Sequence, residues 1–446
     1  MYQSLTSLQQ DIQRALSITN DDIAIKNGGF LRESVIDKLI MTAMFSAHTE
    51  LSAQSRRLIR HIARLQGIYP ASIYPLYMAI ADKKVSGFTV PAINIRALTY
   101  DMARVIFSLA KKHAIGAFVL EIARSEMEYT EQPPELFSLS VLAAAIKEGF
   151  QGPLFLQGDH FQFHQAIFRE NPQQEIHALE KLISEAIAAE FYNIDIDAST
   201  LVDLDKADLS QQQKQNYEMT ARLTNYIREK EPKNTTISIG GEIGHIGDKN
   251  STVEDFDAFM TGYTKKATKP GLSKVSVQTG TSHGGTPLPN GTLAQKTVDF
   301  SILTDIGNRA REKYRMAGAV QHGASTLPEN AFSKFLQAET LEVHLSTEFQ
   351  NIIFESMPHT LRDTIDTWLS ENLKAEWNKD WDKTQFLYKT RKKALGPFKK
   401  EMWSLRETEK APIREKLSEY LTMLFASFNV SNTKDVVNKY IPQPHQ

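Results

Sequence analysis

Three histidines of this chain lie at or just after the ends of short apolar runs. His160 follows GPLFLQGD, His283 follows KVSVQTGT, and His322 lies within GAVQHGA. Three imidazoles are enough to hold a divalent ion such as Zn²⁺ and still leave one coordination position open for a substrate. Because the sequence contains no cysteine, any metal must be held by His, Asp or Glu. The histidines predict a catalytic metal centre if the fold brings them together.

A lone histidine at a strand end is more often a hydrogen-bonding residue than a ligand. Three histidines in equivalent positions favour metal binding, since histidines with separate structural roles have no reason to occur together at strand ends. The other candidates carry less weight: His164 lies past a strand end, His177 lies on a helix face, and His344 lies within a strand.

A carboxylate stands beside one of the histidines, because Asp159 directly precedes His160. Successive residues at a strand end point in different directions, so a histidine that faces the ion leaves its neighbour facing the substrate. Asp159 is then placed to give and take the proton of a substrate hydroxyl. The alternative is an aspartate that forms a turn or supports a ligand.

Small residues follow the other two histidines. Gly284 comes after His283, and Gly323 and Ser325 come after His322. Backbone N–H groups exposed by such residues at the ends of the last strands are the usual phosphate seat of a (β/α)8 barrel. Tight turns alone would explain the same residues.

The elements that must position these residues are eight short β-branched or apolar runs. They cover residues 88–94, 116–122, 152–159, 191–199, 235–243, 274–281, 318–324 and 341–347. Helical patterns separate them, and this alternation matches the (β/α)8 barrel, which takes about 250 residues. An open doubly wound sheet is the second choice, because no Gly-rich phosphate loop follows the first strand.

Two further regions flank the predicted barrel of residues 86–356. Residues 1–85 repeat apolar positions at three- and four-residue steps and predict a helical N-terminal extension. Residues 357–446 are polar and Lys-rich and predict a helical C-terminal extension, packed on the barrel or on a neighbouring subunit.

Charge and hydropathy exclude several classes of partner. Lys and Arg number 51 against 53 Asp and Glu, and the formal charge of −2 offers no attraction to nucleic acid or to an acidic membrane. The N-terminus lacks the cationic and apolar parts of a signal peptide, and no apolar run is long enough to span a bilayer. We expect a soluble, cytoplasmic protein.

Ordered motifs along residues 91–347 resemble those of the class II, metal-dependent fructose-bisphosphate and tagatose-bisphosphate aldolases. LQGDH is similar to the family's L-x-x-D-H, VSVQTGTSHG to its A-h-G-T-x-H-G, and VQHGASTLPE to its L-H-G-A-S-x-h-P. PAINIRALTY, NIDIDAS, GGEIGHIGD and LEVHLSTEFQ resemble further segments of the family in the same order. The two H-G segments and the D-H pair carry most of the resemblance.

The resemblance implies a lyase that reversibly cleaves a ketose 1-phosphate or 1,6-bisphosphate into dihydroxyacetone phosphate and an aldehyde. It implies Zn²⁺ or another divalent ion, a monovalent cation nearby, a sugar phosphate as substrate, and a homo-oligomer, dimeric or higher. The resemblance implies that Asp159 is the acid and base. It implies that the metal ligands are His160, His283 and His322, with Glu242. It also implies that the substrate and its phosphate are bound by Asn94, Gly284, Gly323, Ser325, His344, Ser346 and Thr347.

The sequence departs from the family at the substrate half of the site. His344 stands where the family has an Asn that contacts the enediolate, and Ala97 replaces a second Asn. The glutamate expected in a loop is replaced by one of three carboxylates: Asp248, Glu254 or Asp255. These changes keep a second hypothesis open, a weak or silent aldolase-like subunit that binds a partner. A zinc hydrolase ranks third.

Overall fold

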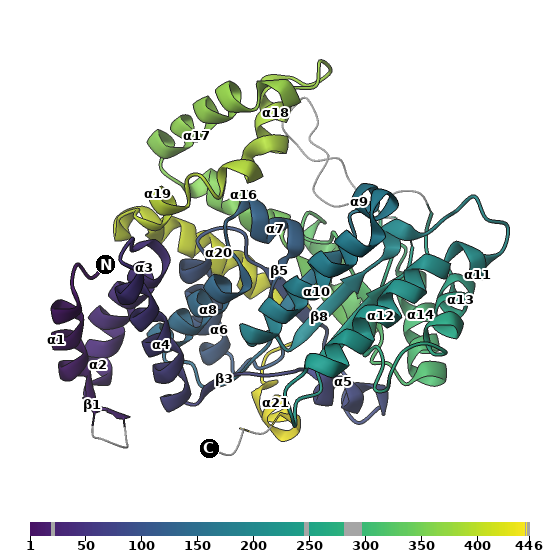
Figure 1. The fold of residues 1–446 in the computed structure, drawn as a ribbon, viewed down its shortest axis with the longest axis horizontal. Helices are drawn as coiled ribbons and strands as arrows, with labels where there is room; N and C mark the ends of the chain where they lie inside the picture. Colours follow the sequence, from purple (N-terminus) through teal and green to yellow (C-terminus); the bar gives the residue numbers. More distant parts are fainter. Residues whose placement is uncertain (19–22, 245–248, 281–296, 442, 444–446) are drawn as a thin grey trace.

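In the computed structural model, which describes residues 1–18, 23–244, 249–280, 297–441 and 443, eight parallel strands close into a barrel (Figure 1). Each strand pairs with the next along the chain, and the last pairs with the first. The strands are β4 (Val90–Asn94), β5 (Val119–Ala123), β7 (Leu156–Gln162), β8 (Asn193–Asp197), β9 (Ser238–Glu242), β10 (Lys274–Val277), β11 (Ala319–Gln321) and β12 (Glu342–Leu345). All eight predicted strands are confirmed.

A helix follows every strand and covers the outside of the barrel (Figure 1). In chain order these helices are α6 (Thr99–Lys112), α8 (Pro134–Glu148), α10 (Pro172–Ala188), α12 (Lys214–Lys230), α13 (Val253–Tyr263), α14 (Phe300–Tyr314), α15 (Phe332–Gln337) and α16 (Thr347–Ser356). Their apolar stripes pack on the strands, as in α14, which buries Leu303, Ile306 and Ala310 and contacts β10 and β11. The predicted (β/α)8 barrel is confirmed.

The predicted strand at residues 152–159 is divided in two. Its first part, β6 (Gly152–Leu154), leaves the barrel and pairs with β3 (Ile68–Pro70), while β7 begins at Leu156. Pro153 has no N–H to donate to a ladder, and a two-stranded sheet outside the barrel wall tolerates this loss.

The chain before the barrel contains strands as well as helices. Helices α1 (Leu5–Ala15), α3 (Ile36–Phe45), α4 (Thr49–Leu65) and α5 (Tyr74–Ala81) accompany the hairpin of β1 (Leu16–Ile18) and β2 (Ile23–Ile25). Helices α3 and α4 pack against α8, at the left of the view in Figure 1. The boundary near residue 85 stays a prediction.

The chain after the barrel is helical and folds back over it. It forms α17 (His359–Asn372), α18 (Lys383–Thr390), α19 (Lys399–Trp403), α20 (Glu407–Ser427) and α21 (Lys434–Tyr440). Helix α20 packs on α6 and α16, and α21 contacts α5, whereas α17 and α18 stand at the top of the view (Figure 1). Across the described ranges, no helix combines the length and apolar character needed to cross a membrane.

Candidate active site

The predicted acid, Asp159, and the first predicted metal ligand, His160, are adjacent residues in the middle of β7. The pairing of β7 with β8 shifts register between Gly158 and Phe161, and His160 has a φ of 41°. A Cβ at position 158 would overlap the Phe161 ring, so the bulge depends on glycine there. His160 Nε2 lies 3.8 Å from Asp159 Oδ1. Instead of pointing in different directions, as we expected, both side chains therefore face the mouth of the barrel.

Two carboxylates from neighbouring strands hold His160. Its Nδ1 lies 3.0 Å from Asp197 Oδ2 and 3.0 Å from Glu242 Oε2, at the last residues of β8 and β9. Burial lowers the pKa of His160, but the charges of Asp159 and Glu242 outweigh burial and raise this pKa well above its ordinary value. Burial and the charge of Asp197 raise the pKa of Glu242 to about 7. The site thus holds an excess of negative charge around an imidazole.

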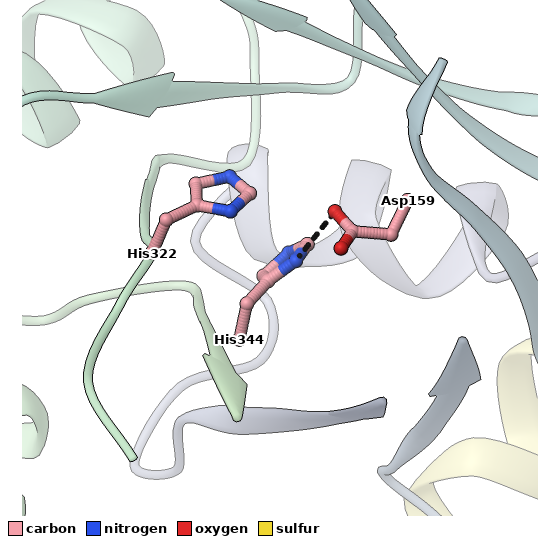
Figure 2. A group of neighbouring side chains, drawn as sticks. All are labelled: Asp159, His322 and His344. Atoms are coloured by element: carbon pink, nitrogen blue, oxygen red, sulfur yellow. Dashed lines mark hydrogen bonds and ion pairs between the residues drawn. The ribbon is translucent and has the colours of Figure 1, made fainter. Parts of the chain in front are cut away.

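His322 and His344 lie beside these groups, as Figure 2 shows for both rings and Asp159. The His322 ring centroid is 4.1 Å from that of His160 and 4.1 Å from that of His344. His322 Nε2 is 2.7 Å from the Ser276 hydroxyl. His322 and His344 are buried residues, with 7% and 5% of their surface exposed. Three imidazoles therefore lie side by side across the barrel mouth, with the planes of adjacent rings tilted by 47° and 44°.

These side chains offer the donors that a divalent metal needs. His160, Glu242 and His322 each present a ligand atom within 4.8 Å of the other two, and Asp159, His322 and His344 form a second such group. Two imidazoles with a carboxylate are an ordinary ligand set for a catalytic divalent ion. His283, the third predicted histidine ligand, and Gly284 lie outside the described residues.

A cavity of about 200 Å³ opens in front of these histidines. Of the predicted site residues, the cavity is lined by Asp159, His160, His322, Gly323, His344 and Ser346. Gly323 has a φ of 68°, a conformation that favours glycine. Most of the predicted site residues in the described ranges thus line one space or lie beside it.

The predicted phosphate-binding residues gather at the N-terminus of α16. This helix begins at Thr347, directly after Ser346, whose Oγ accepts a hydrogen bond from Arg96 Nη2 at 2.9 Å. The N–H of Glu348 donates to Ser325 Oγ at 3.4 Å. A helix N-terminus with small polar residues and an arginine is a favourable seat for an anion.

Asn94, the last residue of β4, lies beside Asp159. Its Nδ2 donates to Glu126 Oε2 at 2.6 Å and lies 3.5 Å from Asp159 Oδ2. Glu126 is also paired with Arg96 at 2.6 Å. Asn94 therefore connects Asp159 to the Arg96 side of the cavity.

The two described candidates for the loop carboxylate lie on α13. The Asp255 side chain accepts from the N–H of Thr252 at 3.0 Å and so caps this helix, while Glu254 is exposed. Asp248 lies outside the described residues. Asp255 has a structural role as a helix cap.

Several polar residues of the site were missed from the sequence. Glu121, Lys274 and Glu342 are charged residues within otherwise apolar strands, and this pattern could have marked them as buried groups of the barrel interior. Arg96 and Lys392 also line the cavity. Lys392 follows α18, far along the chain from the barrel, and no pattern in the sequence indicates its position.

The barrel and its mouth define the class of protein to which this chain belongs. The model of the class-II fructose-bisphosphate aldolase family matches residues 77–410, three quarters of the sequence. The chain belongs to this family. Membership supports an aldolase, a lyase, in general terms, and the family is typically metal-dependent.

Solved structures show the same fold at low sequence identity. Fructose-bisphosphate aldolase from Campylobacter jejuni superimposes with a TM-score of 0.50 at 14% identity, over 82% of this chain and 96% of that one. A protein from Sinorhizobium meliloti 1021, described as a "probable tagatose 6 phosphate kinase", has a TM-score of 0.52 at 13% identity, over 76% and 100%. Comparison with curated proteins finds no match.

Proposed function

We propose that this chain is a metal-dependent aldolase that reversibly cleaves a ketose 1-phosphate or 1,6-bisphosphate into dihydroxyacetone phosphate and an aldehyde. The observation that carries the proposal is the meeting of Asp159, His160 and His322 in one cavity. The N-terminus of α16, beside the same cavity, supplies a seat for the phosphate.

The residues that would hold the metal are His160 and His322, with Glu242 as a carboxylate ligand. Their atoms converge, and the negative charge around His160 favours a cation. When bound, a divalent ion such as Zn²⁺ supplies Lewis-acid polarisation of a substrate carbonyl.

Asp159 is the group placed to move a proton. In the cleavage direction it takes the proton of the C4 hydroxyl as the C3–C4 bond breaks, and in condensation it returns that proton. Only 5% of Asp159 is exposed, so the carboxylate acts in a largely dehydrated site. Contacts with Asn94 at 3.5 Å and with His344 at 3.1 Å restrict its orientation.

The remaining residues bind and orient the substrate. Ser346 and Thr347 begin α16, where the helix dipole favours a phosphate, and the Ser325 hydroxyl lies against the N–H of Glu348 in the first turn of this helix. The Arg96 guanidinium, which donates to Ser346 and is paired with Glu126, lies on the same side.

The test is a chemical one. Purified protein is incubated with dihydroxyacetone phosphate, a panel of aldehydes and Zn²⁺, and the condensation products are identified. EDTA should abolish the reaction, Zn²⁺ should restore it, and borohydride with substrate should trap no adduct. A borohydride adduct would contradict the proposal, and stoichiometric Zn²⁺ binding without any product would favour the silent, partner-binding subunit.

A further inference from the structure

A cluster of buried polar side chains fills the barrel beneath the cavity. Lys274 Nζ lies 2.9 Å from Asp195 Oδ2, donates to Gln157 Oε1 at 2.8 Å, and also pairs with Glu342. Tyr77, which comes from α5, donates its hydroxyl to Glu342 as well. All of these side chains are buried. Glu342 is therefore held from several directions and has little freedom to move.

His344 joins this cluster to the carboxylate at the mouth. Its Nε2 lies 2.7 Å from Glu342 Oε1, and its Nδ1 lies 3.1 Å from Asp159 Oδ1 and 3.2 Å from Glu121 Oε2. Glu342 and His344 are two residues apart on β12, so strand alternation turns both of them into the barrel. Figure 2 shows the contact between His344 and Asp159.

We propose that His344 is a positioning residue that orients Asp159, and that Glu342 fixes His344 in turn. The kinetic consequence of this inference rests on the proposed function, whereas its structural part does not. A carboxylate that is bonded to an anchored donor is held in one orientation, which is what a group that must meet a substrate hydroxyl requires.

The geometry distinguishes this role from direct contact with the substrate. Both ring nitrogens of His344 already face carboxylate oxygens, so a hydrogen bond from either nitrogen to a substrate would have to displace Asp159 or Glu342. The His322 ring lies against the His344 ring, with centroids 4.1 Å apart and planes tilted by 44°. His344 lines the cavity, but both of its nitrogens are engaged by carboxylates, so we expect it to act on the base rather than on the substrate.

The structural part can be tested without turnover, by NMR of the full-length protein labelled with ¹⁵N-histidine. The ring N–H resonances of His344 are identified by their loss in His344→Phe. Asp159→Asn should shift the Nδ1–H resonance, and Glu342→Gln should shift the Nε2–H resonance. His344 resonances that stay unmoved in both variants would overturn the inference, whatever the enzyme catalyses.

The kinetic part compares two reactions of the Zn²⁺-loaded enzyme. Cleavage needs the C4 proton transfer, whereas exchange of the C3 proton of dihydroxyacetone phosphate in D₂O does not. His344→Phe, which removes both ring N–H groups without introducing the family's Asn, should lower kcat for cleavage by about 10- to 100-fold, while KM and the exchange rate stay near their wild-type values. Equal losses in both reactions, or an unchanged kcat, would overturn the inference. Wild-type protein that is inactive in both reactions would contradict the proposed function instead, and the NMR result would still decide the inference.

Two further variants control for loss of structure. Glu342→Gln keeps the size of the side chain but removes the charge that faces both His344 and Lys274, so its folding is checked first by circular dichroism. In folded protein it should lower kcat for cleavage less than His344→Phe and again spare the exchange. His177→Phe changes an exposed histidine on α10 and should leave both reactions unchanged. If His344→Phe does not fold, folded Glu342→Gln carries the same test, and an unchanged kcat in that variant would overturn the inference.

Discussion

Lys274 and Glu342, which lie on β10 and β12 with β11 between them, form an ion pair that is completely buried inside the barrel. Burial lowers the pKa of Lys274, but the charges of Asp195 and Glu342 outweigh burial and raise this pKa above its ordinary value, so the lysine stays charged. Such a pair persists only when further hydrogen bonds satisfy both ions. Gln157 and Tyr77 supply these bonds.

Lys274→Met should therefore be strongly destabilising. It leaves the Asp195 and Glu342 carboxylates buried without their cation, and removing one partner of a buried pair costs about 3–5 kcal/mol. Urea denaturation of the metal-free protein measures the free energy of unfolding. Lys313→Met, which removes an exposed lysine paired with Asp257, is the control and should change little. A Lys274→Met protein as stable as the control would contradict this account.

Gly240→Ala tests the space around the same lysine. A Cβ at this position would overlap Asp195 Oδ1, lie 2.8 Å from Asp195 Cγ and lie 3.0 Å from Lys274 Cε. Overpacking of this kind costs about 1–3 kcal/mol. In Gly29→Ala the new Cβ meets its nearest described atom at 3.5 Å, an ordinary contact, so this variant should unfold at nearly the wild-type denaturant concentration. Equal midpoints for the two variants would contradict the prediction.

Asp159→Asn should remove proton transfer and keep the metal. An amide has no basic oxygen for the C4 hydroxyl, and the loss of a general base lowers kcat by about 10²- to 10⁴-fold. Metal content and cleavage rates are measured on the same preparation. Asp257→Asn, at a surface carboxylate, should keep full activity. Retained cleavage in Asp159→Asn would assign the proton transfer to another residue.

Glu121 should make stability depend on pH in a defined direction. Burial and the charge of Asp159 raise the pKa of Glu121 to about 7 from an ordinary 4.5. The folded state then holds this proton more tightly than the unfolded state, so the stability that Glu121 contributes is complete below about pH 4.5 and is lost as the pH rises through about 7.

Glu121→Gln removes this dependence. Relative to wild type, the variant should become progressively more stable as the pH rises through that window, as measured by urea denaturation of metal-free protein on either side of it. A difference in stability that stays constant with pH would show that Glu121 does not titrate there.

Lys392 brings the C-terminal segment into the cavity, beside Arg96 and Ser346. A charged hydrogen bond to a phosphate contributes about 1.5–3 kcal/mol, so Lys392→Met should raise KM for a phosphorylated substrate about 10- to 100-fold with little change in kcat. The neighbouring Lys393 pairs instead with Glu376 at 2.6 Å and does not line the cavity. Lys393→Met is therefore a matched control, and equal KM values for the two variants would contradict the prediction.

The barrel could be predicted because its signals are local. Each strand is a short apolar run, each helix has its own apolar stripe, and their alternation leaves few folds. The candidate site at the strand ends followed from the same reasoning. The division of residues 152–159 could not be predicted, because only the pairing of Ile68–Pro70 with Gly152–Leu154 removes that segment from the barrel.

By itself, the sequence determined the eight strands and the residues at their carboxyl ends, since side chains that follow parallel strands must share one end of a barrel. Only the tertiary structure decided where those side chains point. His160 lies near Asp159 at the bulge where the pairing of β7 with β8 shifts register. His344 meets Asp159 from 185 residues away along the chain. Such contacts depend on the closure of the barrel, which no local pattern encodes.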